Sequence, residues 1–294
     1  MQITKPIFIV GTGRCGSTAL HRLLARHPQL MWLSGFAEQF PYNPAWNRWA
    51  VTAVGNPLLR GLLGGRIRPG ENYGFWYKHA YGFAEPGRDL TREDVTPRVR
   101  KQVRRVLEAM LTRTRSRMLV KLTGWSRIGF LHEIFEDAKF IHIVRDGRAV
   151  ASSLLHIGSW QWRGWYGPSS WRYGQLSAED QAAWEACNRS FVALAGLQWR
   201  IHSRAVEAAR QALDPKLFLE IKYETFCEQP LEVSRRALEF AELEPSSAFD
   251  RQVKEASIKN MSSRWRDDLS PEQQALLTGL LREDLLRYGY DVTR

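Results

Sequence analysis

The chain reads Ile7-Phe8-Ile9-Val10-Gly11-Thr12-Gly13-Arg14-Cys15-Gly16-Ser17-Thr18-Ala19-Leu20 near its N-terminus. An apolar strand runs into a glycine-rich turn, and helix-compatible residues follow from Ser17. This order aims backbone N–H groups and the positive end of a helix at one place, which makes an anion site. The stretch therefore predicts an α/β fold built around an anion-binding loop.

The loop resembles the Walker A pattern G-x-x-x-x-G-K-[ST], with one decisive difference. Residues Gly11 to Thr18 keep the spacing, but Ser17 stands where the lysine belongs. Without that lysine we do not expect ordinary hydrolysis of a nucleoside triphosphate. Arg14 supplies a cation from another position in the loop. The loop predicts a phosphorylated cofactor that is not ATP used as a kinase uses it.

Three other interpretations of the loop are possible. A dinucleotide fingerprint G-x-G-x-x-G needs an acidic residue about 20 residues later, and Glu38 is the first acid, beyond the expected second strand. A phosphatase loop needs an arginine six residues after its cysteine, but His21 stands six residues after Cys15. Cys15 is therefore predicted to be a small filler of the turn. A tight turn without a ligand is the remaining alternative.

Composition and charge limit the classes of protein to which the chain can belong. The chain has 294 residues, 44% hydrophobic and 25% charged, which is ordinary for a soluble globular protein. It contains no run of about 18 apolar residues, so we expect no membrane span. Three widely spaced cysteines predict free thiols, a cytoplasmic location and no metal site. The net charge of +11 favours anionic partners, but no nucleic-acid-binding module is visible.

Short apolar segments alternate with helical patterns along the chain. We predict parallel strands at Pro6–Val10, Leu30–Leu33, Met118–Leu122, Lys139–Arg145 and Leu217–Lys222. We predict helices at Ser17–Arg26, Ala149–His156, Ala178–Ala212 and, with a basic outer face, Arg98–Arg117. This alternation indicates a three-layer doubly wound parallel sheet of about five strands, in a single domain covering residues 1–294.

Two segments break the alternation and are rich in aromatic residues. Residues 41–87 have weak periodicity, and residues 157–175 hold four tryptophans and two tyrosines between 158 and 174. Long irregular insertions on an α/β scaffold commonly form lids or binding loops. We interpret both as substrate-cap insertions; aromatic packing that holds an awkward loop together is the alternative.

A second candidate anion site follows the strand at 139–145. Arg145 stands at the carboxyl end of this strand, where open α/β sheets bind ligands. Ser153 lies eight residues later, two turns into the next predicted helix. The pair predicts a site for a second phosphate. The alternative is a Walker B strand in which Asp146 holds magnesium, and the absent loop lysine disfavours it.

Taken together, these motifs resemble the PAPS-dependent sulfotransferases, most closely the bacterial and Golgi-type branches. The loop is similar to the family's 5′-phosphosulfate motif, and Arg145 with Ser153 is similar to its 3′-phosphate motif. Further similar segments follow in the family's order: Leu219-Glu220-Ile221-Lys222-Tyr223-Glu224, Ser263-Arg264-Trp265-Arg266-Asp267-Asp268-Leu269-Ser270 and Tyr288-Gly289-Tyr290. The resemblance spans about residues 6–290.

The resemblance implies a P-loop-like fold and transfer of a sulfuryl group from 3′-phosphoadenosine 5′-phosphosulfate (PAPS), leaving PAP, to a hydroxyl or amine, without a metal. It implies a small-molecule, glycan or lipid-headgroup acceptor. It also implies that Lys121 lies near the transferring group. The implied cofactor-binding residues are Gly13, Arg14, Cys15, Gly16, Ser17, Thr18, Arg145, Ser153, Tyr223, Lys259 and Asn260.

The acceptor must also lose a proton to a general base. Many cytosolic relatives place a histidine two residues after the strand lysine, but this position holds Thr123. Other branches use a glutamate shortly after the first helix, and Glu38 is nearest to that place. We predict Glu38 as the base, with His156 as the rival. A P-loop kinase and a non-catalytic anion-binding protein remain the alternative functions.

Overall fold

The centre of the fold is a five-stranded parallel sheet. The computed structural model describes residues 1–83, 87–157 and 176–293. Within them the strand order is β2-β3-β1-β4-β5, and all four pairings are parallel. The strands are β1 Ile7–Gly11, β2 Leu30–Trp32, β3 Arg117–Thr123, β4 Lys139–Val144 and β5 Phe218–Lys222. Every predicted strand is confirmed to within one residue at each end.

β1 lies in the middle of the sheet and is entirely buried. The chain leaves it to build β2 and β3 on one side and then crosses to β4 and β5 on the other. The carboxyl end of β1 is therefore the switch point of the sheet, where doubly wound folds bind their ligands. The predicted anion-binding loop begins there.

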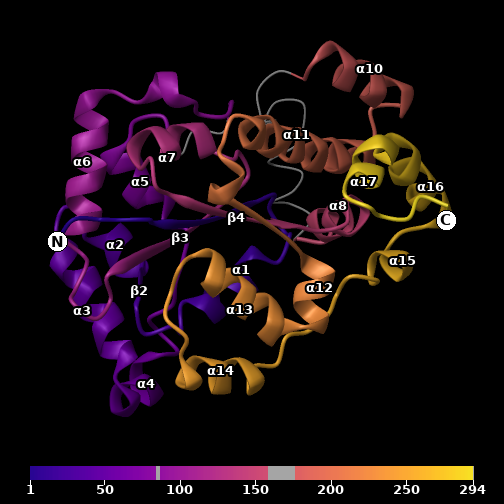
Figure 1. Ribbon diagram of the computed structural model, residues 1–294. Helices are drawn as coiled ribbons and strands as arrows, with labels where there is room; N and C mark the ends of the chain where they lie inside the picture. Colours follow the sequence, from indigo (N-terminus) through magenta and orange to yellow (C-terminus); the bar gives the residue numbers. More distant parts are fainter. Residues whose placement is uncertain (84–86, 158–175, 294) are drawn as a thin grey trace.

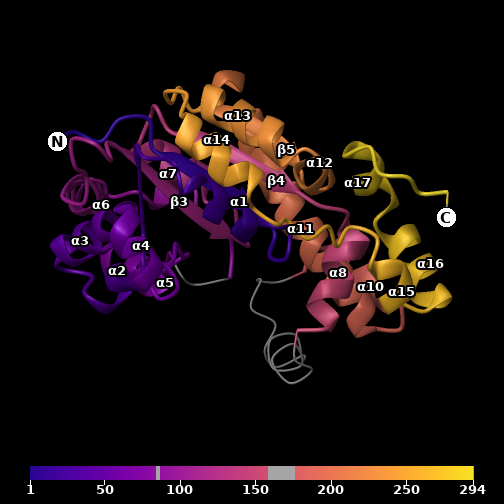
Figure 2. The ribbon, with the colours of Figure 1, turned by 90° about the horizontal axis from the view of Figure 1, so that it is seen from below.

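Helices cover both faces of the sheet (Figures 1 and 2). α7 and α11 lie on one face, and α1, α13 and α14 lie on the other, so the predicted three layers are present. The helices up to residue 134 are α1 Ser17–Leu24, α2 Gly35–Gln39, α3 Pro44–Gly55, α4 Pro57–Leu63, α5 Tyr73–His79, α6 Pro97–Glu108 and α7 Ile128–Ile134. The later helices are α8 Gly147–Leu155, α10 Ala178–Ala186, α11 Phe191–Gln211, α12 Tyr223–Glu228, α13 Pro230–Phe240, α14 Ser247–Lys254, α15 Trp265–Asp268, α16 Pro271–Leu280 and α17 Arg282–Arg287.

Two helix predictions were too long. The predicted helix Ala178–Ala212 is two helices, because Asn188 and Arg189 have positive φ angles of 52° and Ser190 caps a new start by accepting a hydrogen bond from the Ala193 N–H. The predicted helix Arg98–Arg117 ends at Glu108, and Arg117 already belongs to β3. The apolar residues after Glu108 are buried without being helical.

The insertion at residues 41–87 is more regular than its sequence pattern indicated. It contains α3, α4 and α5, which lie together beside the β2 edge of the sheet (Figure 1). Asn43 and Pro44 start α3 with a side-chain cap and a proline in the first turn. Several aromatic residues of α3 face outward, so apolar residues do not recur at helical spacing in this stretch. Of the second predicted insertion, residues 158–175 lie outside the described residues.

The three cysteines are free thiols, as predicted. No helix in residues 1–83, 87–157 or 176–293 is both long and apolar enough to cross a bilayer. A second buried cluster joins α8 and α11 to the C-terminal helices α15–α17 and is centred on Trp199, Trp265, Leu281 and Leu285. This cluster holds the start of α8, and with it the second predicted anion site, against the sheet.

Candidate functional site

The loop after β1 has the conformation of a close-fitting anion cradle. Arg14 and Gly16 have positive φ angles of 68° and 90°. α1 starts at Ser17, and no side chain caps its N-terminus. The positive end of α1 therefore points into the loop without a capping side chain at Gly16. Cys15 is fully buried and packs against Gly11, as expected for a filler of the turn.

Gly16 is required for two separate reasons. Its φ angle of 90° is one that side chains rarely adopt. In addition, a Cβ atom there would lie 2.2 Å from a ring carbon of Tyr223. The aromatic ring therefore rests directly on the loop backbone, which only glycine permits.

We expect Gly16→Ala to lower the free energy of unfolding by at least about 1–3 kcal/mol, the cost of a strained left-handed residue. Gly13→Ala is the matched control, because a Cβ at Gly13 would meet no atom within 4 Å. Urea unfolding of both variants measures the difference. Equal losses for the two would contradict the packing of Tyr223 on Gly16.

The two predicted anion sites meet in space. Arg14 donates from Nε to Ser153 Oγ over 3.0 Å, so the loop touches α8. Arg145 donates from Nη1 to the Arg14 carbonyl over 3.1 Å and from Nη2 to the Met261 carbonyl. In the part of the chain that the structure describes, no carboxylate pairs with either arginine. Burial and the nearby Arg145 charge lower the pKa of Arg14.

Tyr223 joins these elements to the C-terminal segment. The Arg145 guanidinium carbon lies 4.6 Å from the centre of the Tyr223 ring. The phenol donates to the Lys259 carbonyl over 3.3 Å and accepts from the Met261 N–H over 3.4 Å. Burial raises the pKa of Tyr223 to about 12 and so keeps the phenol protonated. The segment around Lys259 is therefore held beside Arg145 and Tyr223, and its contact with a phosphate stays a prediction.

Asn260 belongs to the same segment but faces its own loop. Its Oδ1 accepts from the Ser262 N–H over 2.9 Å and from the Ser262 hydroxyl over 2.7 Å. It shapes the turn that positions the Met261 carbonyl against Arg145. Direct contact between the Asn260 side chain and a ligand stays a prediction.

Lys121 lies beside Thr18, where the loop passes into α1. It is buried in β3, and its Nζ donates to Thr18 Oγ1 over 2.9 Å. The same ammonium lies 3.2 Å from Glu71 Oε1, which also accepts from the Thr123 hydroxyl. Thr123 is the position at which many cytosolic relatives place their base. The structure thus brings a carboxylate to that position from a distant segment.

Glu38 and His156 stand in different surroundings. Glu38 is exposed on α2, and its carboxylate packs against Gly74 of α5. Among the described residues it makes no hydrogen bond or ion pair. His156 caps the C-terminus of α8, and its Nδ1 lies 2.7 Å from the Ser152 carbonyl. His156 therefore has the geometry of an exposed helix-end residue.

Sequence reasoning missed Glu71. It lies in the insertion at residues 41–87, where no periodic pattern assigned its side chain a direction. The clue available was that Glu71 is the first acid after Glu38. The magnesium interpretation of Asp146 finds no support, because Arg148 binds its carboxylate over 2.8 Å and Asp146 caps α8.

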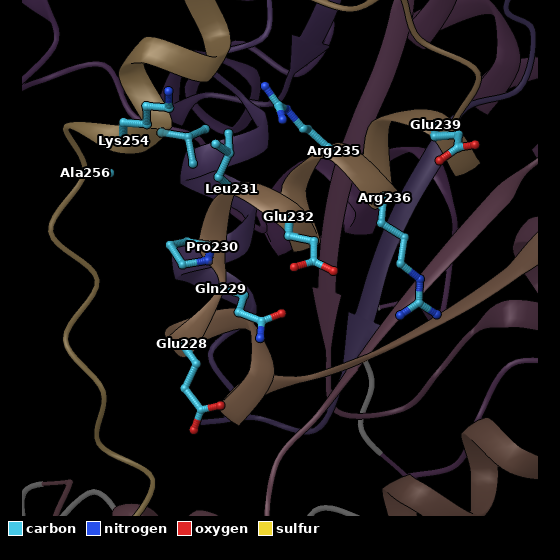
Figure 3. A pocket seen from close by; sticks show the side chains of 11 residues that line it. Glu228, Gln229, Pro230, Leu231, Glu232, Arg235, Arg236, Glu239, Lys254 and Ala256 are labelled. Atoms are coloured by element: carbon cyan, nitrogen blue, oxygen red, sulfur yellow. The ribbon is translucent and has the colours of Figure 1, made fainter.

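A separate open groove of about 800 Å³ lies between α13 and α14 (Figure 3). Side chains of both signs line it, among them Glu228, Glu232, Arg236 and Lys254. It contains none of the predicted site residues. Because its charges are mixed, we expect the groove to bind a doubly phosphorylated ligand more weakly than the loop does.

Comparison with known proteins decides the family. A family model described as "Sulfotransferase family" matches residues 6–247, which include the loop, Lys121, Arg145 and Tyr223. The chain belongs to the sulfotransferase family. This membership favours sulfuryl transfer over the kinase and the non-catalytic anion-binding alternatives.

Proteins similar to this sulfotransferase include distant mycobacterial sulfotransferases. The omega-hydroxy-beta-dihydromenaquinone-9 sulfotransferase Stf3 of Mycobacterium bovis is 24% identical over 308 residues, covering 97% of this chain and 75% of that protein. The crystal structure of sulfotransferase STF9 from Mycobacterium avium has a TM-score of 0.64 at 18% identity and covers 99% of this chain and 78% of that one. The sulfotransferase domain from the curacin biosynthetic pathway has a TM-score of 0.55 at 14% identity and covers 99% of both chains. These likenesses show that the sulfotransferase has a P-loop-like fold.

Proposed function

We propose that this sulfotransferase takes its sulfuryl group from PAPS, releases PAP, and transfers the group to a hydroxyl or amine. The observation that carries the proposal is the convergence of Arg14 and Arg145 without a carboxylate partner among the described residues. The charge of Arg145 contributes to lowering the pKa of Arg14, so an anion bound beside both guanidinium groups would stabilise them.

The residues fit a bisphosphorylated nucleotide. Arg145 is only 8% exposed, and its buried Nε has no hydrogen-bond partner in the part of the chain described. A buried donor without a partner is costly and indicates a missing acceptor. In our proposal Arg145 and Ser153 hold the 3′-phosphate, and the loop from Gly13 to Thr18 holds the 5′-phosphate. Tyr223 and the Lys259–Asn260 segment flank the nucleotide.

When bound, the donor supplies an activated sulfuryl group on a phosphate leaving group. Arg14, Lys121 and the N–H groups at the start of α1 place fixed positive charge where negative charge develops during transfer. Because these donors belong to a folded loop, they need little reorganisation during the reaction. Thr18 orients Lys121 through the 2.9 Å hydrogen bond.

We assign the general base to Glu38 rather than Glu71. Glu71 Oε1 already accepts from Lys121 and Thr123, so its charge is compensated. Glu38 is exposed and makes no polar contact with the described residues, so its lone pairs are available for an acceptor proton. Glu71 is then a positioning residue that holds Lys121.

The acceptor is proposed only as a class. The name of the Mycobacterium bovis relative describes a hydroxylated, lipid-like acceptor. That name supports a hydroxyl on an amphiphilic molecule here, while small molecules and glycans remain within the proposal. We also propose that the chain forms a single domain and that residues 41–83 belong to its acceptor-side cap.

Thermal unfolding with three nucleotides tests the proposed donor. At a hundredfold excess over its Kd, a ligand stabilises the protein by about 2.7 kcal/mol. We expect this effect from adenosine 3′,5′-bisphosphate and little from ATP or NAD, because neither ATP nor NAD carries a 3′-phosphate for Arg145. Equal stabilisation by ATP, or none by the bisphosphate, would reject PAPS as the donor.

A further inference from the structure

One side of the molecule exposes an unusual number of large hydrophobic side chains. Nine of the twelve found exposed in the described residues lie between positions 40 and 81. We call the following group the aromatic face: Phe40, Tyr42, Trp46, Trp49, Leu58, Leu59 and Leu62. Trp46, Trp49 and Leu62 are 45%, 52% and 75% exposed. A concentration of this kind indicates a contact surface.

The aromatic rings of this face adjoin one another, and the helix that carries its leucines packs beside them. The Phe40 and Trp46 rings lie 5.4 Å apart between centroids, and Trp46 and Trp49 lie 6.3 Å apart. α4, which carries the three leucines, packs beside α3, which carries the tryptophans. In Figures 1 and 2 these helices lie together at the β2 edge of the sheet, far from α17.

The charge of this region is mainly positive, with exposed Glu38 of α2 at its border. Residues 39–70 contain four arginines, Arg48, Arg60, Arg66 and Arg68, and no aspartate or glutamate. Arg48, Arg66 and Arg68 are exposed. Exposed tryptophan and leucine combined with arginine are typical of protein segments that lie in the interface of a membrane.

We propose that the aromatic face docks on the surface of an anionic lipid bilayer. The rings and leucines enter the headgroup region, and the arginines pair with lipid phosphates. A second copy of this chain fits the face less well, because a symmetric contact would bring arginines against arginines. The proposal is independent of the proposed donor, since it needs no nucleotide.

Docking would be peripheral. No helix in the described residues qualifies as a membrane span. Peripheral binding of this kind combines buried apolar area with attraction to anionic lipids, so it depends on lipid composition and weakens with salt. These two dependences separate the proposal from simple hydrophobic adsorption.

Sedimentation with vesicles tests the proposal. Vesicles of phosphatidylcholine alone are compared with vesicles containing about one-third phosphatidylglycerol, without nucleotide. We expect binding to the anionic vesicles only. Arg66→Ser with Arg68→Ser should weaken this binding on the order of 30-fold, at about 1 kcal/mol for each arginine near an anionic surface. Trp46→Ser with Trp49→Ser should weaken it at least about tenfold.

Arg282→Ser with Leu286→Ser is the matched control, because it removes an exposed arginine and a 53% exposed leucine from α17. This variant should bind like the unchanged protein. Circular dichroism and thermal unfolding check that each variant folds. Equal binding to neutral vesicles, equal loss in the α17 control, or a concentration-dependent dimer without vesicle binding would overturn the proposal. The first two outcomes leave PAPS binding untouched, so the two proposals fail separately.

Discussion

Glu38→Gln is expected to lower kcat by about 10² to 10⁴, the usual contribution of a positioned general base. The amide keeps the size of the side chain but cannot accept the acceptor's proton. Binding of adenosine 3′,5′-bisphosphate should stay nearly unchanged, because Glu38 contacts none of the loop residues that the structure describes. Steady-state kinetics with labelled donor, together with calorimetric binding, separate the two effects.

Glu71→Gln is the matched control for this experiment. The amide still contacts Thr123 and Lys121, and Lys121 keeps its hydrogen bond to Thr18. We expect kcat to fall by about tenfold or less. If Glu71→Gln shows the larger loss of kcat, then Glu71 is the base. His156→Gln should change little, because the ring caps the end of α8.

Arg145→Ala is expected to weaken the binding of adenosine 3′,5′-bisphosphate by about 30-fold to several thousandfold. The reason is that a buried phosphate would lose its charged partner, at about 2–5 kcal/mol. Arg145 also holds the Arg14 and Met261 carbonyls, so part of the loss comes from a looser loop. Calorimetric titration measures the Kd.

Two further variants identify the cause of the affinity loss in Arg145→Ala. Arg145→Lys keeps the charge but not the fork of donors, so it should recover part of the affinity. Ser153→Ala should cost less than Arg145→Ala, because it removes a single neutral hydroxyl. Urea unfolding shows whether each protein is folded. An unchanged Kd in folded Arg145→Ala would remove the 3′-phosphate assignment.

The sheet and the loop were predictable from the sequence because short-range rules decide them. Buried parallel strands appear in the sequence as short apolar runs, and the spacing of the glycines identifies the loop. The sequence predicted a second phosphate site separate from the loop, so the contacts of Arg14 with Ser153 and Arg145 are a finding of the structure. The eight-residue separation from Arg145, which follows β4, predicted Ser153 on the helix after that strand, and Ser153 lies in α8.

Other features depend on contacts that no local pattern encodes. Glu71 reaches Lys121 from 50 residues away in sequence, along a segment whose direction the hydrophobic pattern did not reveal. The break between α10 and α11 occurs at Asn188 and Arg189, which adopt the left-handed conformation although neither is glycine. The sequence alone does not predict this conformation for them. The outward-facing aromatic side chains of α3 likewise obscured its helical period.

α2 carries Glu38 between Phe36 and Phe40, and Phe40 belongs to the aromatic face. If that face rests on lipid, proton removal takes place at the boundary between water and membrane. Turnover would then follow the mole fraction of acceptor within the bilayer rather than its concentration in bulk solution. Diluting the acceptor with inert lipid would slow the enzyme even when the total amount of acceptor is constant.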